Sequence, residues 1–255
     1  RNEGSILSLG QKMWRRAKNI IPGGNMLLSK RPEMYAPNQW PSYYKKAKGC
    51  HVWDLENKKY LDMSLMSVGT NILGYSNNLV DNAVIKAIKS SNMSSLNCAE
   101  EIHLSEKLID MHKHFDMVRY ARTGGEANAI AIRLARAASG KDKVAICGYH
   151  GWHDWYLSAN LNKKVSNGVL KNHLLPGLST DGVPKNLKNT VYPFNFNDIK
   201  ALEKICSNNK IGVIKMEIFR NIPPKDNFLE KVRKLATKKK IVLIFDECTS
   251  GFRET

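Results

Sequence analysis

Hydrophobic positions in the first part of the chain follow helical and alternating patterns. Apolar residues recur every three to four positions in Ser5–Ile20, Leu79–Ser90 and Ala99–Phe115, which predicts amphipathic helices. Between the first two of these, His51–Leu55 and Tyr60–Met63 alternate in polarity on either side of a polar turn. This alternation predicts a β-hairpin.

From Asp116 onward, short apolar runs alternate with amphipathic stretches. Such alternation is typical of parallel strands joined by helices that cross over the sheet. We therefore predict an α/β fold with three layers, α/β/α, around a mainly parallel sheet. The expected strands are Met117–Ala121, Lys143–Cys147, Thr190–Pro193, Ile211–Ile218 and Ile241–Phe245, and the expected helices are Glu126–Ala138, Asp198–Cys206 and Asp226–Thr237.

The change of pattern suggests two parts. Residues 1–75 are expected to form an N-terminal segment containing the first helix and the hairpin, and residues 76–255 a larger α/β domain. Residues 162–188 are rich in Gly, Pro, Asn and Ser and show no clear period. A loop of that length is uncommon unless it lines a site or reaches a partner subunit.

The apolar run Ile241–Phe245 leads directly into the carboxylates Asp246 and Glu247. A continuous run of this kind is typical of a strand buried on both faces, and open α/β sheets bind ligands at the carboxyl ends of their strands. A buried carboxylate needs a cation or several hydrogen bonds. The protonated ring nitrogen of a cofactor would be a suitable partner for Asp246. Alternatively, Asp246 caps the turn or helix that follows.

A glycine pair follows the expected strand Met117–Ala121. In Thr123-Gly124-Gly125-Glu126, backbone amides can converge at the start of a helix, whose partial positive charge favours an anion. The sequence therefore predicts a phosphate cradle. A tight strand-to-helix turn with Thr123 as N-cap explains the same residues.

Polar and aromatic residues follow the expected strand Lys143–Cys147, and Glu217 ends the expected strand Ile211–Ile218 on the same side of the sheet. Tyr149 has a flat face that could stack on an aromatic cofactor, although core packing explains it equally. His150 and His153 with Asp154 resemble part of a metal site, but no third ligand is in view, so a zinc centre is a poor interpretation. Glu217 would place a second carboxylate beside Asp246, or it is a salt-bridge residue at a strand end.

Composition excludes several classes of protein. The chain has 40 Lys and Arg against 23 Asp and Glu, a net charge of +17. The basic residues are dispersed along the chain, which argues against a nucleic-acid partner. The positive charge would still favour small anionic substrates. The five cysteines form no C-x-x-C pair, which favours a reducing, cytoplasmic setting over a disulfide framework. No apolar run approaches the roughly 18 residues that span a membrane.

The order of these features resembles the large domain of the fold-type I pyridoxal-phosphate enzymes. Within that superfamily the chain is similar to the class III aminotransferases, and most similar to their glutamate-1-semialdehyde aminomutase branch. The resemblance spans nearly the whole chain, and its last run is the most specific. The residues that carry it are Ile21-Pro22-Gly23-Gly24, Ile72-Leu73-Gly74, Glu126-Ala127, Arg133–Arg136, Tyr149-His150-Gly151, Glu217 and Asp246–Arg253.

The resemblance implies pyridoxal 5'-phosphate as cofactor and the following roles. Thr123, Gly124 and Gly125 would hold the cofactor phosphate. Tyr149 would cover one face of the pyridine ring, and Cys248, where the family usually has Val, the other. Asp246 would pair with the protonated ring nitrogen, so that Asp246 and Tyr149 are the expected catalytic residues in this chain. His150 and Glu217 are expected beside the cofactor, and no metal is implied.

The resemblance also implies an amino-group transfer between small molecules in a homodimer. Two departures bear on it: Gly125 replaces the family's Thr, and Ile218 replaces a common Pro. The Schiff-base lysine would lie beyond Thr255, so the chain is expected to be an N-terminal portion that is inactive by itself. An aminomutase and a transaminase for ω-amino acids or keto-sugars remain open, as does a non-catalytic binding protein with this fold.

Overall fold

The computed structural model describes residues 7–64, 66–91, 93–162, 173, 178–219 and 221–253, apart from the side chain of Leu28. The chain forms two compact units, Arg1–Ala99 and Glu100–Thr255. Among the described residues, no helix has the length and apolar character needed to cross a membrane.

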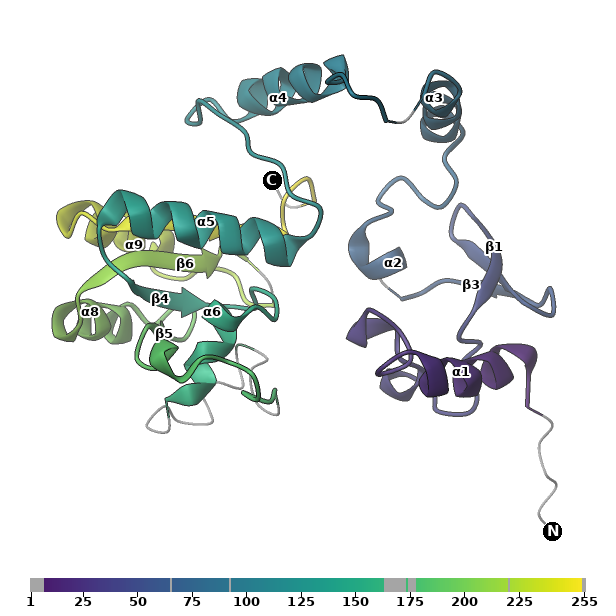
Figure 1. Ribbon diagram of the computed structural model, residues 1–255, viewed down its shortest axis with the longest axis horizontal. Helices are drawn as coiled ribbons and strands as arrows, with labels where there is room; N and C mark the ends of the chain where they lie inside the picture. The colour runs from purple at the N-terminus through teal and green to yellow at the C-terminus, as the bar shows by residue number, and fades with distance from the viewer. Residues whose placement is uncertain are drawn as a thin grey trace, which may run out of the picture. The chain divides into compact units, whose positions relative to one another are not determined.

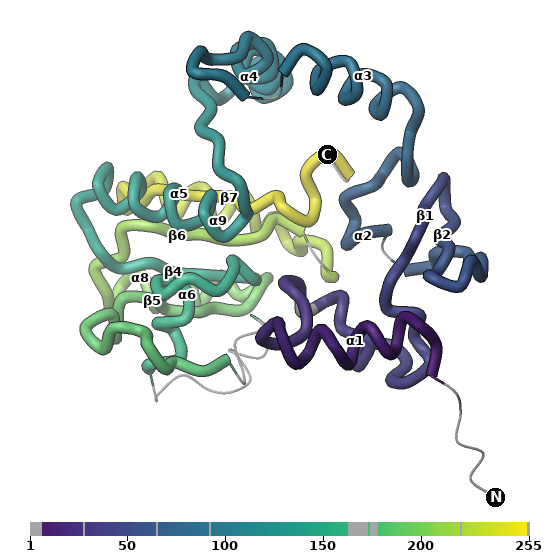
Figure 2. Tube along the Cα trace, turned by 45° about the vertical axis from the view of Figure 1, so that its right-hand side comes forward, coloured from purple at the N-terminus to yellow at the C-terminus, as the bar shows by residue number. Residues whose placement is uncertain are grey.

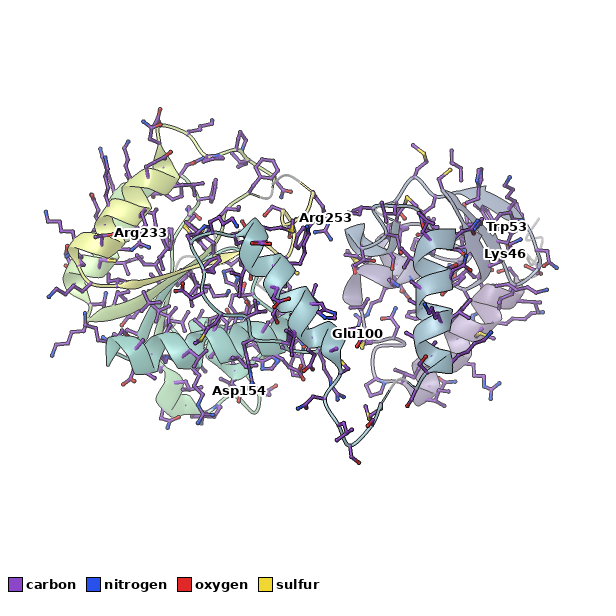
Figure 3. All side chains as sticks on the ribbon, turned by 90° about the horizontal axis from the view of Figure 1, so that it is seen from above. Lys46, Trp53, Glu100, Asp154, Arg233 and Arg253 are labelled. Carbon is purple, nitrogen blue, oxygen red and sulfur yellow. The ribbon has the colours of Figure 1, made fainter. Side chains whose placement is uncertain are left out.

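The N-terminal unit contains the predicted helix and hairpin. Helix α1 (Leu9–Ile20) begins at a capping box in which Ser8 and Gln11 satisfy each other's backbone amides. Strands β2 (His51–Asp54) and β3 (Lys59–Leu61) form the predicted antiparallel hairpin, and β1 (Tyr44–Lys48) adds a third strand beside β2. Figure 3 labels one contact of this sheet, in which the ammonium of Lys46 lies 5.0 Å from the ring centre of Trp53.

Two further helices follow. Both α3 (Asn78–Lys89) and α4 (Ala99–Met111) form where helical spacing predicted them, and neither has a buried residue. Most of their apolar side chains are exposed. The remaining short elements of this region are two 3-10 turns, Leu28–Lys30 and Pro32–Met34, and the helical turn α2 (Met66–Gly69).

The C-terminal unit contains the predicted parallel sheet. Its strands are β4 (Lys143–Cys147), β5 (Val191–Pro193), β6 (Ile211–Glu217) and β7 (Val242–Asp246), in the spatial order β5-β4-β6-β7, and every neighbouring pair is parallel. Every residue of β6 is buried, as expected for an apolar run in the middle of a sheet. The α/β fold class is thereby confirmed.

Helices cover both faces of this sheet, as Figure 1 shows for α5 and α8. One core joins α8 and α9 to the sheet through side chains such as Leu202, Val232 and Ile214. The other core joins α5, α6 and the 3-10 turn after it to the opposite face, through Ile132 and Tyr156. The helices are α5 (Gly124–Ser139), α6 (Asp154–Leu157), α8 (Ile199–Asn208) and α9 (Phe228–Lys238), and the 3-10 turns are Ser158–Leu161 and Lys185–Leu187.

One predicted strand is wrong. Residues 117–121 pair with no described strand, and Met117 and Tyr120 are 88% and 40% exposed. A strand needs a hydrogen-bonded neighbour, which a local pattern of apolar residues cannot guarantee. Of the long loop predicted at residues 162–188, most of 163–177 lies outside the described residues, and Lys185–Leu187 forms a short 3-10 turn.

Candidate active site

Asp246 is the last residue of β7 and the centre of a buried polar network. Its Oδ2 lies 2.8 Å from Nδ1 of His150 and 3.4 Å from Nζ of Lys215. Its Oδ1 accepts a hydrogen bond of 3.1 Å from the amide of Cys248. One oxygen of Asp246 therefore caps the turn after β7, as one interpretation predicted, and the other has ionic and hydrogen-bonding partners within the protein.

The network holds Asp246 ionised. Burial by itself raises the pKa of Asp246, but the hydrogen bond from His150 and the positive charge of Lys215 outweigh it, so the pKa lies well below its usual value. His150 is also held by the carbonyl of Cys147, 3.1 Å from its Nε2. Three elements of the sheet edge thereby fix the orientation of one carboxylate.

Glu217 ends β6 beside Asp246, because the register of β6 and β7 pairs these two residues. Its Oε2 accepts a 3.2 Å hydrogen bond from the amide of Tyr149, and Oε1 lies 3.5 Å from the Thr249 hydroxyl. The backbone of Gly148, at φ +107°, makes room for this carboxylate. Glu217 therefore fastens the segment after β4 to the segment after β7.

The first turn of α5 forms the predicted helix start. Thr123 is its N-cap, and in a capping box with Glu126 the Thr123 hydroxyl accepts from the Glu126 amide at 3.2 Å while the Glu126 carboxylate accepts from the Thr123 amide. The amides of Gly124 and Gly125 are the first of the helix, so no carbonyl one turn earlier can accept from them. They remain suited to an anion at this helix start.

Segments distant in the sequence meet at this helix start. A methyl group on Gly151 would come within 3.3 Å of the Cα of Gly125, and one on Gly124 would lie 3.8 Å from Sγ of Cys248. Four segments at the carboxyl edge of the sheet thus supply the predicted residues, which are Thr123, Gly124, Gly125, Tyr149, His150, Glu217, Asp246 and Cys248. Figure 2 shows the strands β4, β6 and β7 running alongside α5 toward that edge.

Tyr149 and Cys248 are partly accessible in this arrangement. The Tyr149 ring meets Tyr156 edge to face, with ring centres 6.0 Å apart, and 37% of Tyr149 is exposed. Burial and the charge of Asp246 raise the pKa of Cys248, so its side chain is a neutral thiol at neutral pH. An exposed ring and a neutral thiol are both suited to contact with a flat aromatic group.

Sequence reasoning missed Lys215 at this edge and considered His153 only as part of a metal site. Lys215 reaches Asp246 from inside β6, and the only available signal was a lysine at an alternate position of an otherwise apolar strand. His153 lies against the start of α5, where Nε2 would be 2.9 Å from a methyl group on Gly125. The imidazole thus occupies space that a larger residue at position 125 would need.

Comparison with known proteins identifies the family. The family described as aminotransferase class-III matches residues 34–255. The chain belongs to the class-III aminotransferase family. The resemblance noted in the sequence is therefore confirmed.

Individual class-III relatives match across almost the whole chain. A 3-aminobutyryl-CoA aminotransferase of Cloacimonas acidaminovorans is 33% identical over 256 residues, covering 97% of this chain and 56% of that protein. A glutamate-1-semialdehyde 2,1-aminomutase of Methanothrix thermoacetophila is 33% identical over 254 residues, with the same coverage of each. The chain spans about half the length of these curated relatives.

A solved structure shows the same fold. The FumI protein of Sphingopyxis sp. MTA144, in its pyridoxal-phosphate internal aldimine form, superposes with a TM-score of 0.80 at 22% identity. The match covers 96% of this chain and 56% of that one.

Proposed function

We propose that the full-length protein is a pyridoxal 5'-phosphate enzyme that transfers an amino group, as an aminotransferase or a 2,1-aminomutase. The observation that carries this proposal is the placement of Asp246, an ionised and firmly oriented carboxylate at the same sheet edge as an open helix start. Membership of the class-III family supports it. The chain spans about half the length of its curated relatives, so the activity is proposed for the full-length protein.

The residues present fit the cofactor. The amides of Gly124 and Gly125 would receive the phosphate, which a helix start favours. A carboxylate has about four acceptor positions, and three of those on Asp246 are in use, so Oδ1 retains one for the ring nitrogen. Tyr149 and Cys248 would lie against the ring faces.

The chain's own residues would orient the cofactor and maintain its charge. Pyridoxal phosphate supplies an electron sink for the substrate when its ring nitrogen is protonated. Asp246 would hold that proton, and His150 would hold Asp246 through the 2.8 Å contact. Glu217 would keep the Tyr149 segment in place through the Tyr149 amide.

The substrates we propose are a small amino donor and acceptor. Relatives with the same 33% identity carry both names, a 3-aminobutyryl-CoA aminotransferase and a glutamate-1-semialdehyde 2,1-aminomutase. We favour the aminomutase-like branch on the motifs at Pro22-Gly23-Gly24 and Asp246–Arg253. A transaminase for ω-amino acids or keto-sugars is the alternative within the same chemistry.

We further propose that the protein is a homodimer in the cytoplasm. The exposed apolar side chains of α3 and α4, none of them buried, support a partner surface. All five cysteines are free thiols, which supports a reducing compartment.

Reconstitution of the full-length protein tests the proposed function. Wild type incubated with pyridoxal 5'-phosphate is expected to gain a visible absorption band that bleaches when an amino donor is added. Asp246→Asn should lower turnover on the order of 10²-fold, as loss of a group that stabilises developing charge does. Asp226→Asn, at an exposed position with φ +50° that Asn tolerates, is the matched control and should behave as wild type. Absence of cofactor binding by wild type would refute the proposal.

A further inference from the structure

Lys215 is a buried cation that has no role in the proposed amino-group transfer. It lies within β6, and only 2% of its side chain is exposed. Lysine is almost never fully buried unless it is paired, because an ammonium loses its hydration. Its partner is Asp246, whose Oδ2 lies 3.4 Å from Nζ.

The strand geometry places this ammonium behind the carboxylate. Lys215 and Glu217 lie on the same face of β6, since side chains alternate along a strand. Glu217 pairs in register with Asp246 and Lys215 with Ile244, so Lys215 approaches from two residue pairs further inside the sheet. The Cys248 amide contacts the other oxygen from the loop beyond β7. The free acceptor position of Asp246 is therefore on Oδ1, whereas Lys215 occupies Oδ2.

The surroundings favour an ammonium–carboxylate pair. The groups that face Lys215 are Asp246, Glu217, His150 and Cys248. Burial lowers the pKa of Lys215, and the two carboxylates oppose that effect. Both carboxylates therefore favour the charged form of Lys215.

We propose that Lys215 is a positioning residue that keeps Asp246 ionised and oriented before the cofactor binds, and that limits how strongly Asp246 holds the proton on the cofactor's ring nitrogen. This inference rests on the proposed function. The ammonium and the protonated ring nitrogen are two cations that share one carboxylate. Removing the ammonium therefore makes Asp246 hold the ring proton more strongly. In the cofactor-free protein, the same change leaves the Asp246 carboxylate without its ion pair.

The test uses the full-length protein with pyridoxal 5'-phosphate labelled with 15N at the ring. The 15N shift reports protonation of the ring nitrogen as a function of pH. Lys215→Met, of similar length and without charge, is expected to raise the ring-nitrogen pKa by about one unit, a tenfold tighter hold on the proton. It should also lower the urea midpoint of the cofactor-free protein more than that of the loaded protein. Lys204→Met, the same change at an exposed position of α8, is the matched control.

A second variant covers the case in which Lys215→Met does not fold. Lys215→Gln removes the charge but keeps a donor for Oδ2, and it carries the same expectation for the ring nitrogen. Asp246→Asn should abolish the effect of either Lys215 variant, because the effect acts through that carboxylate. A ring-nitrogen pKa that is the same in wild type, the folded Lys215 variant and Lys204→Met would overturn the role of Lys215 alone. If wild type binds no pyridoxal phosphate, the proposed function and this inference both fail.

Discussion

At the scale of single residues, Asp246 links stability to pH. Its pKa in the folded protein lies below the value of about 3.9 expected in the unfolded chain. A group of this kind stabilises the fold fully above its unfolded pKa, and the contribution is lost as the pH falls toward the folded pKa. Each pKa unit of that difference corresponds to about 1.4 kcal/mol.

The pH dependence of unfolding should therefore change when Asp246 cannot ionise. Between pH 5 and pH 3 the urea midpoint of wild type is expected to fall more than that of Asp246→Asn. Asp226→Asn, which removes an exposed carboxylate, should keep the wild-type slope. Equal slopes for wild type and Asp246→Asn would contradict the ionised network around this residue.

Gly125 offers a second prediction at this scale, because His153 occupies the space beside it. A methyl group at position 125 would lie 2.9 Å from Nε2 of His153, so the ring must move. Gly125→Ala improves helix propensity by up to about 1 kcal/mol, whereas overpacking costs about 1–3 kcal/mol. Stability should change little, while the displaced imidazole disturbs the proposed phosphate cradle.

We expect Gly125→Ala to weaken pyridoxal phosphate binding about tenfold, equivalent to 1.4 kcal/mol. Removing the ring as well, in Gly125→Ala with His153→Ala, should restore much of that affinity. A fluorescence titration of the cofactor-free, full-length protein measures both. If the single variant binds like wild type, His153 does not restrict this position.

At the scale of elements, continuous apolar runs predicted most strands of the parallel sheet well. The local pattern of a segment did not predict whether it pairs with a neighbouring strand. Strands β4 to β7 lie within a residue or two of their predicted bounds. Strand β1 was missed because Tyr44–Lys48 is almost entirely exposed and lysine-rich. Residues 117–121 have the composition of a strand but no neighbour. The apolar pattern of a segment indicates which of its side chains can be buried. Whether the segment forms a strand also depends on a second segment that hydrogen-bonds to it.

In the site, too, the sequence predicted which strand ends lie together but not which side chains touch. Parallel strands made the neighbourhood of Glu217 and Asp246 predictable, because both end strands at one edge. The contact between His150 and Asp246 joins residues 96 positions apart, and Lys215 reaches Asp246 on the neighbouring strand. Such contacts depend on register and side-chain reach, which one sequence does not reveal.

The turn after β4 gives a prediction for an element boundary. Gly148 has φ +107°, and a methyl group there would lie 2.3 Å from Oε2 of Glu217. Gly148→Ala therefore combines backbone strain with a steric clash, and we expect a loss of about 2–4 kcal/mol in the free energy of unfolding. Gly140→Ala is the matched control, since Gly140 has φ +63° at the end of α5 with open space around it.

Urea unfolding of the full-length variants separates these two effects. Gly140→Ala should lose only the roughly 1–2 kcal/mol that left-handed backbone costs a residue with a side chain. The additional loss in Gly148→Ala reports the displacement of Glu217 from the Tyr149 amide. If the two variants are destabilised equally, Glu217 adapts and does not hold that segment.

At the scale of the whole molecule, α3 and α4 have exposed apolar side chains and no buried residue. Val84 and Ile88 of α3, one turn apart and therefore on one face, are 50% and 58% exposed. Exposed apolar surface of this extent marks a binding surface, and stable interfaces bury at least about 1,000 Å² in total. The homodimer proposed for the full-length protein provides such a partner.

A charge on this face should therefore weaken the dimer. In full-length protein, Val84→Glu with Ile88→Glu is expected to shift the sedimenting species from the mass of two chains toward that of one, because two carboxylates would be buried without partners. Lys86→Glu, on the same helix at an exposed position, should remain dimeric and controls for the added negative charge. Helical content by circular dichroism should stay the same in all three, since α3 contributes no buried residue to its own unit. A double variant that sediments as wild type would exclude α3 from the interface, and a monomeric wild type would refute the proposed dimer.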